Sequence, residues 1–175
     1  MNKIILIYEW FIRTVLYFLP DIPIFMRFRG WLYSFSLQKC GYNFQITHNA
    51  IVRSSYSISI GNNVYIANNC VLLGGGIMEL EDEVMIGPNC VIATRKHTQQ
   101  NNSFRYGKAI IGTISIGRGA WIAANCTIVT NSLLPDYSVL GANSMLNKIF
   151  LNENSLYAGT PAKFIKKIER TDDNN

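Results

Sequence analysis

Charged residues are scarce in this chain of 175 residues, at 15% of the total against the roughly 25% common in soluble domains. This composition argues against a disordered chain, an acidic tail or a highly charged coiled coil. The net charge is +5, and no run of Lys and Arg marks a nucleic-acid-binding surface. We therefore expect one domain that buries its own core and has no nucleic-acid partner.

Histidine and cysteine are also rare. His48 and His97 are the two histidines, which leaves little room for a histidine-rich metal site. The four cysteines form no C-x-x-C motif and are too few for a disulfide scaffold. We therefore expect no metal and a reduced, cytoplasmic location.

A long uncharged apolar run is missing from the N-terminus. Glu9 and Arg13 interrupt the stretch before Pro20, which therefore lacks the ~18 consecutive apolar residues of a spanning helix. No small-residue cleavage site follows, which argues against a signal peptide. The spacing instead predicts an amphipathic helix with apolar positions at Ile4, Ile5, Tyr8, Phe11, Ile12, Val15 and Leu16.

A second helix is predicted from Pro23 to about Cys40. Proline suits the first turn of a helix, and Gly41 is a stop signal. Arg27 and Arg29 fall off its apolar stripe. The stripe consists of Ile24, Phe28, Trp31 or Leu32, and Phe35.

A six-residue repeat replaces the helical pattern after Gly41. Each unit contains an aliphatic residue, a small or acidic one, two polar ones, a small one and a variable one. Residues 60–65 (Ile-Gly-Asn-Asn-Val-Tyr) and 66–71 (Ile-Ala-Asn-Asn-Cys-Val) are one such pair, and further pairs begin at Leu80, Ile116 and Leu134. Three such units form one triangular coil of a parallel β-helix.

The spacing of equivalent aliphatic residues predicts how the coils stack. The steps between them are 20, 20, 36, 18 and 18 residues. The step of 36 is one coil plus an excursion from Ala93 to Gly112 that contains His97, and long insertions in solenoids are usually functional. The equivalent positions are Ile46, Ile66, Ile86, Ile122, Leu140 and Ala158.

The repeat also accounts for three of the cysteines. Cys70, Cys90 and Cys126 each follow a stacked aliphatic by four residues, and Ser144 and Ala162 take this position in later coils. We expect them to form an inward ladder of small residues, where a free cysteine behaves as a small hydrophobe.

These motifs resemble the hexapeptide-repeat acyltransferases, in particular the maltose, galactoside and polysaccharide O-acetyltransferase branch, over about residues 42–168. The specific matches are Ile-Gly-Pro-Asn-Cys-Val-Ile from Ile86 followed by the loop histidine, Tyr-Gly-Lys from Tyr106, Ala-Trp-Ile-Ala from Ala120, Gly-Ala-Asn-Ser from Gly141 and Ala-Gly-Thr-Pro-Ala-Lys from Ala158. The resemblance implies an all-β solenoid: a left-handed parallel β-helix with N-terminal α-helices and a long loop extruded from one coil. It also implies acetyl transfer from acetyl-CoA, and a homotrimer with active sites between subunits.

Acetyl transfer to a hydroxyl requires a base and donors to the developing oxyanion. His97 matches the loop histidine of the family, which implies that it is the general base. Asn69 resembles the asparagine with which sugar acetyltransferases contact the acceptor, although a turn-forming role explains it equally well. His48 lies outside any motif and is interpreted as part of the scaffold.

The resemblance also implies a set of acetyl-CoA contacts. Trp121 matches the tryptophan beside the pantetheine channel, and Ala124 offers an amide to the thioester oxygen. Lys148 and Lys163 are interpreted as partners of the CoA phosphates or, equally, as solvated lysines. The full set is Trp121, Ala124, Ala142, Asn147, Lys148 and Lys163.

Two departures from the family separate this chain from the maltose and galactoside enzymes. Residues 79–83 are acidic where a Thr-Ile-Gly-Asp type of turn is usual, and the aromatic N-terminal segment is instead similar to the polysaccharide-modifying branch. We expect this segment to cap the first coil, as terminal repeats require, or to contact the inner face of a membrane. The expected segments are 1–41 (helical), 42–163 (β-helix) and 164–175, with a loose tail over 171–175.

The predicted activity is acetyl-CoA-dependent O-acetylation of a saccharide of a surface polysaccharide, O-antigen or capsule, or of its precursor. N-acetylation of an amino-sugar nucleotide and acetylation of an antibiotic are the enzyme alternatives. A γ-type carbonic anhydrase shares the fold, but two histidines cannot supply its three zinc ligands. A non-catalytic β-solenoid scaffold is the alternative from another class.

Overall fold

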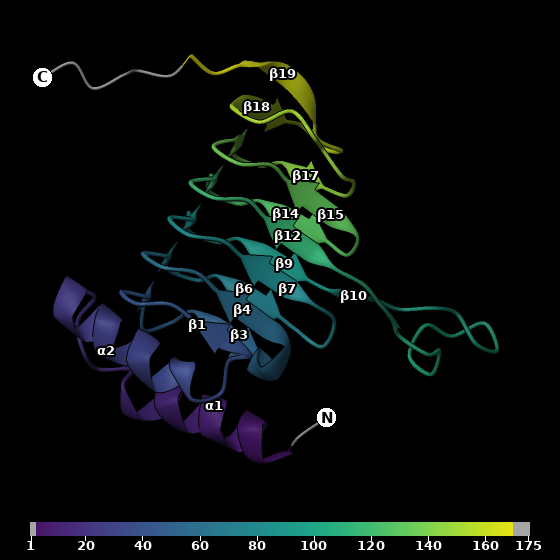
Figure 1. The fold of residues 1–175 in the computed structure, drawn as a ribbon. Coiled ribbons are helices and arrows are strands. Elements are labelled where there is room, and N and C mark those ends of the chain that lie inside the picture. The colour runs from purple at the N-terminus through teal and green to yellow at the C-terminus, as the bar shows by residue number, and fades with distance from the viewer. Residues whose placement is uncertain (1–2, 170–175) are drawn as a thin grey trace, which may run out of the picture.

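The computed structural model describes residues 3–169, in which two helices precede a stack of short parallel strands (Figure 1). The helices, α1 (Lys3–Val15) and α2 (Pro23–Ser34), lie side by side across the first coils. The chain then winds upward, and the later strands lie at the opposite end of the stack. The predicted left-handed parallel β-helix with N-terminal helices and one extruded loop is confirmed.

Three sheets form the sides of the stack. Face A is five-stranded: β1 (Lys39–Cys40), β4 (Ile58–Ile60), β7 (Met78–Leu80), β12 (Ile114–Ile116) and β15 (Ser132–Leu134). Face B is seven-stranded: β2 (Gln45–Ile46), β5 (Tyr65–Ile66), β8 (Met85–Ile86), β13 (Trp121–Ile122), β16 (Val139–Leu140), β18 (Ser155–Ala158) and β19 (Lys163–Lys167). Face C is five-stranded: β3 (Ile51–Arg53), β6 (Val71–Leu73), β9 (Val91–Ala93), β14 (Thr127–Val129) and β17 (Met145–Leu146). One coil contributes one strand to each face, and β19 turns back antiparallel to β18.

The strand register follows the predicted spacing of aliphatic residues as far as Leu140. Ile86 pairs with Ile122, and Ile122 pairs with Leu140. The next equivalent is Tyr157 and not Ala158, so that prediction was wrong by one residue. Tyr157 is fully buried and stacks on Phe150 with ring centroids 4.0 Å apart. A large ring fills the last coil, whose core has no further coil above it.

The core of the stack is a column of aliphatic side chains beside a ladder of small ones. Cys70, Cys90 and Cys126 are buried and unpaired, which confirms the inward ladder. Each thiol donates a hydrogen bond to a carbonyl of the following coil, at Gly87, Ala123 and Gly141 respectively, with donor–acceptor distances of 3.1 Å. The cysteines therefore belong to the scaffold.

The long excursion is a two-stranded antiparallel ribbon. β10 (Arg95–Lys96) pairs with β11 (Ile110–Ile111), and Gly112 returns to the stack by donating its amide hydrogen to the Thr94 carbonyl. Figure 1 shows this ribbon extending away from the coils. Each of the two 20-residue steps has two residues more than an 18-residue coil, and these steps contain a 3₁₀ turn, η1 (Ser55–Ser57), and a bend at residues 75–76.

Helix α2 packs on the first coil with one side, and the predicted apolar stripe lies on the opposite side of the same helix. Met26, Arg29, Gly30 and Tyr33 are the buried residues of α2, and the stripe faces solvent. Gly30 lies against the Phe44 carbonyl, where any side chain would clash. This close approach turns the glycine side of the helix inward.

Helix α2 also ends earlier than predicted, at Ser34 rather than near Cys40. Lys39 and Cys40 instead form β1, which pairs with β4. Because β4 lies one coil later in the chain, the spacing of residues 35–40 gives no sign that this segment pairs with it. Of the expected segments, residues 171–175 lie outside the described part of the chain, and the boundaries 1–41, 42–163 and 164–175 stay predictions.

Candidate active site

His97 lies on the ribbon, directly after β10, and its side chain is exposed. The ribbon is shaped locally by a hydrogen bond of 2.6 Å from the Thr98 hydroxyl to the Lys108 carbonyl. Gly107 packs against the Thr98 carbonyl so closely that a side chain would clash. Within residues 3–169, no hydrogen bond to the His97 ring is found. The imidazole is therefore exposed and has no hydrogen-bond partner within the described residues.

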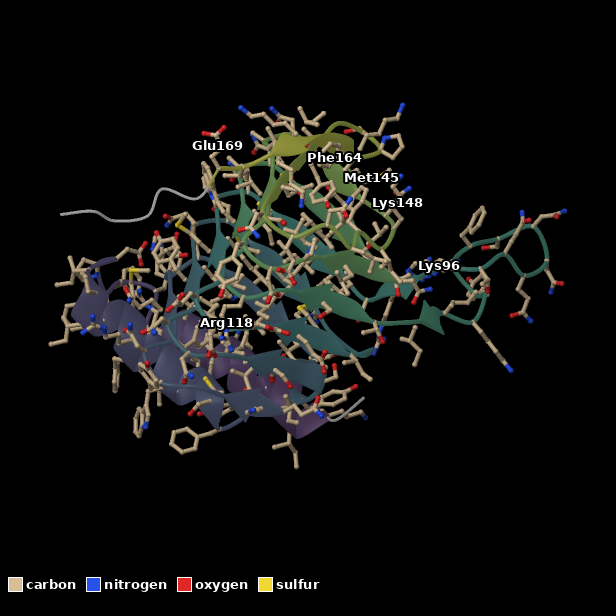
Figure 2. All side chains as sticks on the ribbon, turned by 45° about the horizontal axis from the view of Figure 1, so that its top comes forward. Lys96, Arg118, Met145, Lys148, Phe164 and Glu169 are labelled. Atoms are coloured by element: carbon tan, nitrogen blue, oxygen red, sulfur yellow. The ribbon has the colours of Figure 1, made fainter. Side chains whose placement is uncertain are left out.

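The root of the ribbon lies at the edge where the chain passes from face C to face A. We call this the CA edge (residues 54–57, 74–77, 94–113, 130–131 and 147–148). The register of β17 on β14 and of β14 on β9 places Asn147 and Lys148 two coils beyond the start of the ribbon. Figure 2 shows Lys148 on the side of the stack from which the ribbon with Lys96 projects.

Lys148 and Lys163 are both exposed on the C-terminal coils. The ammonium of Lys148 lies 5.1 Å from the centre of the Phe150 ring, a cation–π contact. Lys163 is the first residue of β19 and pairs with Ala158. Neither lysine has an acidic partner among the ion pairs of residues 3–169, so both are available to an anion.

A second group of predicted residues lies at the edge between faces B and C. We call this the BC edge (residues 67–70, 87–90, 123–126 and 141–144). Ala124 and Ala142 occupy equivalent turns of successive coils, where the Asn143 amide donates to the Ala124 carbonyl at 3.0 Å. The Ala124 amide N–H has no backbone acceptor within residues 3–169. Trp121 lies on β13, the strand that leads into the turn with Ala124, and its side chain is 44% exposed.

Asn69 is also on the BC edge, in a ladder of stacked asparagines. Its side-chain amide donates to the Asn89 side chain at 3.0 Å, and its side-chain oxygen accepts from Asn49 at 2.6 Å. Its backbone φ of 60° is in the left-handed region that asparagine tolerates well. These contacts favour the turn-forming interpretation, and a contact of Asn69 with the acceptor stays a prediction.

A polar cluster that the sequence analysis did not find lies where the cap meets the first coils. Asp21 accepts hydrogen bonds from the His48 ring Nδ1 at 2.7 Å, from the Asn68 side chain at 2.9 Å and from Arg29 at 2.8 Å. The His48 backbone amide also donates to Asp21, at 2.9 Å. The four side chains come from three segments far apart in the chain, so no local spacing could have revealed the cluster.

The cluster sets the electrostatics of Asp21. Partial burial alone would raise the pKa of Asp21, but hydrogen bonds from His48 and Asn68 lower it below its usual value. A carboxylate that is hydrogen-bonded to Nδ1 holds an imidazole ring in one orientation, as in the acid–base pairs of enzymes. His48 is 27% exposed and packs edge-on against Tyr17. It is therefore an oriented and accessible histidine, in addition to its place in the scaffold.

Six of the eight predicted residues thus fall into two groups on different edges, whereas Trp121 and Lys163 lie on strands of face B. His97, Asn147 and Lys148 belong to the CA edge, whereas Asn69, Ala124 and Ala142 belong to the BC edge, with face C between them. In residues 3–169 no three or more His, Cys, Asp or Glu side chains come together in a way that would hold a metal ion. None of the helices in this part of the chain is long and apolar enough to cross a membrane.

Comparison with known proteins supports the resemblance. The galactoside O-acetyltransferase of Escherichia coli K12 is 28% identical over 132 residues, which are 75% of this chain and 55% of that protein. A probable macrolide acetyltransferase of Lysinibacillus sphaericus is 41% identical over 56 residues (32% of this chain, 31% of that protein). A putative lipopolysaccharide biosynthesis O-acetyl transferase of Escherichia coli K12 is 37% identical over 54 residues (31% and 27%). The chain thus spans about half the length of the first of these relatives, and less of the others. No family profile matches the chain.

Solved structures match over nearly the whole chain. A hexapeptide-repeat acetyltransferase of Vibrio cholerae, complexed with acetyl-CoA, has a TM-score of 0.82 at 22% identity, covering 96% of this chain and 89% of that one. A galactoside acetyltransferase in complex with coenzyme A has a TM-score of 0.78 at 24% identity, covering 97% and 84%. At such identities these matches show a shared fold. Together with the sequence relatives, they confirm the resemblance to hexapeptide-repeat acyltransferases.

Proposed function

We propose that this chain is an acetyl-CoA-dependent O-acetyltransferase that acts on a saccharide hydroxyl, in a surface polysaccharide, O-antigen or capsule or in its precursor. The observation that carries the proposal is the exposed histidine on a ribbon rooted at the edge that also bears Lys148. Among the relatives in sequence, one is named for a galactoside and one for lipopolysaccharide biosynthesis.

The proposed reaction is a direct attack on the thioester. His97 accepts the proton of the acceptor hydroxyl while the hydroxyl oxygen bonds to the acetyl carbonyl carbon. The amide N–H of Ala124 donates to the oxyanion that forms. The intermediate then collapses by breaking the carbon–sulfur bond, and the leaving CoA thiolate takes the proton from His97. No covalent enzyme intermediate is required.

Acetyl-CoA is proposed to lie along the C-terminal coils. Trp121 offers an exposed ring beside the pantetheine, and Ala142 and Asn147 line the path toward the reacting carbonyl. Lys148 and Lys163 provide cations for the CoA phosphates, since neither is committed to an ion pair within the described residues.

The division of the residues between two edges supports a homotrimer with active sites between subunits. The base on the CA edge and the Ala124 amide on the BC edge are separated by the width of face C in one chain. Side-by-side packing of chains brings the CA edge of one chain to the BC edge of its neighbour. A site that needs both edges is then complete only in the assembly.

The cluster of Asp21, His48 and Asn68 favours a second assignment of the base. The hydrogen bond to Asp21 orients the His48 ring, a feature that His97 lacks within residues 3–169. In this alternative, His48 takes the acceptor proton, and His97 binds the acceptor or the thioester. Separate substitution of the two histidines distinguishes these assignments.

A turnover screen tests the proposed function. Release of the CoA thiol from acetyl-CoA is followed with a thiol reagent, over a panel of glycosides, oligosaccharides, sugar nucleotides, amino-sugar nucleotides and macrolides. We expect turnover with acceptors that offer only hydroxyls. Turnover confined to amino sugars would establish N-acetylation, and turnover confined to macrolides an antibiotic acetyltransferase. If the chain neither binds acetyl-CoA nor releases the CoA thiol from it with any acceptor, it would instead be a non-catalytic scaffold.

A further inference from the structure

The two N-terminal helices carry stripes of apolar side chains that are exposed on the side away from the coils. We call these stripes the outer face; the side chains are between 43% and 87% exposed. Their spacing of three and four residues places each stripe along one side of its helix, and Phe18 and Phe35 follow just after the helix ends. The members are Ile4, Ile7, Phe11, Val15, Phe18, Ile24, Phe28, Trp31 and Phe35.

Aromatic rings are packed against one another along α2. Phe28 stacks on Trp31 with centroids 5.9 Å apart, and Trp31 meets Phe35 edge-on at 5.0 Å. The opposite side of α2 is the one that packs on the coils, through Met26 and Tyr33. Capping the solenoid therefore does not use this stripe, and its exposure needs another explanation.

The charges near the outer face have one sign. Lys3 and Arg27 are exposed. The two acidic residues of this region point inward: Glu9 is buried and accepts the Ser55 amide at 2.8 Å, and Asp21 is held by Arg29 and His48. An apolar and aromatic stripe flanked only by cations complements a surface that is anionic outside and apolar beneath.

The geometry points to the surface of a membrane with anionic lipids as the partner of the outer face, to which the helices bind without crossing it. Both helices lie across one end of the coil stack (Figure 1), so the face can meet a plane without obstruction from the coils. Trp and Phe side chains suit the boundary between headgroups and acyl chains. This inference does not depend on the proposed function, since it rests on the exposure and charge of the helices alone.

A second copy of the chain is a poorer partner for this face. In a two-fold contact the same patch meets itself, so Lys3 and Arg27 would oppose the same cations of the other copy. No acidic side chain of the helices is free to offset that repulsion, because Glu9 and Asp21 are engaged within the cap. Anionic headgroups offset it directly.

Flotation of the full chain with vesicles tests the inference. The vesicles are phosphatidylcholine alone and phosphatidylcholine mixed with phosphatidylglycerol. We expect the wild-type protein to float with the mixed vesicles and much less with phosphatidylcholine alone. Phe28→Ser with Trp31→Ser should weaken binding at least about ten-fold, because two ring anchors are lost. Lys3→Gln with Arg27→Gln should remove the preference for the anionic lipid.

The matched control removes two exposed apolar side chains far from the helices, through Phe104→Ser with Leu151→Ser, and should bind as the wild type does. Phe11→Ser with Phe18→Ser repeats the test on α1, should the α2 variant lose helix signal in circular dichroism. Absence of flotation with either vesicle would overturn the inference, as would unchanged binding of both helix variants. A change of sedimentation coefficient in the α2 variant without vesicles would assign the face to a second copy instead. Thiol release from acetyl-CoA with a soluble acceptor reads out the proposed function separately.

Discussion

The coil stack and the helical cap bury their side chains by different rules. In the stack, each coil repeats the same contact, with an aliphatic residue placed on the aliphatic residue of the coil before it, as for Ile86 and Ile122. In the cap, each important contact occurs once: Arg29 binds Asp21 and the carbonyls of Leu19 and Ile46, and Glu9 binds the Ser55 amide.

The two kinds of contact contribute to stability in different ways. A repeated apolar contact adds stability coil by coil, so the stack tolerates a long ribbon inserted at one corner. The polar contacts of the cap each occur once and hold a few chain segments in one arrangement, so the loss of any one contact weakens that arrangement. The cap is therefore expected to unfold locally, while the stack unfolds as a unit.

The largest expected effect is a loss of activity in a variant whose coil stack and cap both stay folded. His97→Ala should lower turnover of acetyl-CoA by about a hundred- to ten-thousand-fold, because the attack loses its base. The free energy of unfolding should change by less than about 0.5 kcal/mol, because His97 is exposed. Turnover in a stopped assay and a denaturant titration measure the two quantities.

His48→Gln is the matched variant for that test. Near-normal turnover of His97→Ala, together with a large loss in His48→Gln, would move the base to the Asp21–His48 pair. Equal losses in both would place the two histidines in one site.

The next effect breaks the repeated contacts of the stack. Ile122→Ala should lower the free energy of unfolding by about 2–5 kcal/mol, since Ile122 is fully buried between two coils. Ile111→Ala, at an exposed position of the ribbon, is the control and should change it by less than about 0.5 kcal/mol. A small loss in Ile122→Ala would mean that the coils above and below close the cavity.

A smaller effect is expected in the cap. Arg29→Met should cost about 1–3 kcal/mol, because Asp21 and the carbonyls around the guanidinium lose their donor. The loss should be local: hydrogen exchange of α1 and α2 speeds up while that of β8 and β13 does not. Equal acceleration in both regions would show that cap and stack unfold together.

The smallest effect is the pH dependence of the cap. Because the pKa of Asp21 is lowered in the folded chain, its contribution to stability is complete above the unfolded pKa of about 3.9 and is lost as pH falls through the folded value. The protection of α2 amides from hydrogen exchange, relative to their intrinsic rate at each pH, should therefore fall in acid before that of the coils. Asp21→Asn should remove this dependence, and its persistence in that variant would assign the acid sensitivity to another group.

Much of the stack was predictable from residues that are close in sequence. The six-residue repeat indicates the coil, the spacing of aliphatics predicts the register as far as Leu140, and the step of 36 marks the ribbon. The cysteine ladder follows from the same arithmetic. The coil, the register, the ribbon and the cysteine ladder can all be read from a short pattern that recurs in every coil.

The failures lie where the repeat stops. Tyr157 takes the place predicted for Ala158, and its ring packs against Phe150 and against Phe164 of β19, two contacts that no earlier coil has and that the repeat does not indicate. The outward direction of the α2 stripe depends on Gly30 and Arg29 packing inward, which the apolar spacing does not reveal. The assignments of His97, Asn69 and the CoA residues rest on resemblance and await the tests above.

The parallel β-helix, its inward ladder and the corner from which the histidine-bearing ribbon leaves can be derived from the residues alone, because each coil repeats the same period. The buried side of the helices and the binding of Asp21 to His48 and Asn68 become visible only in the folded chain. These contacts join Asp21, which lies before the repeat, to residues 27 and 47 positions later in the chain. Such pairs meet only once the coils have brought their edges together.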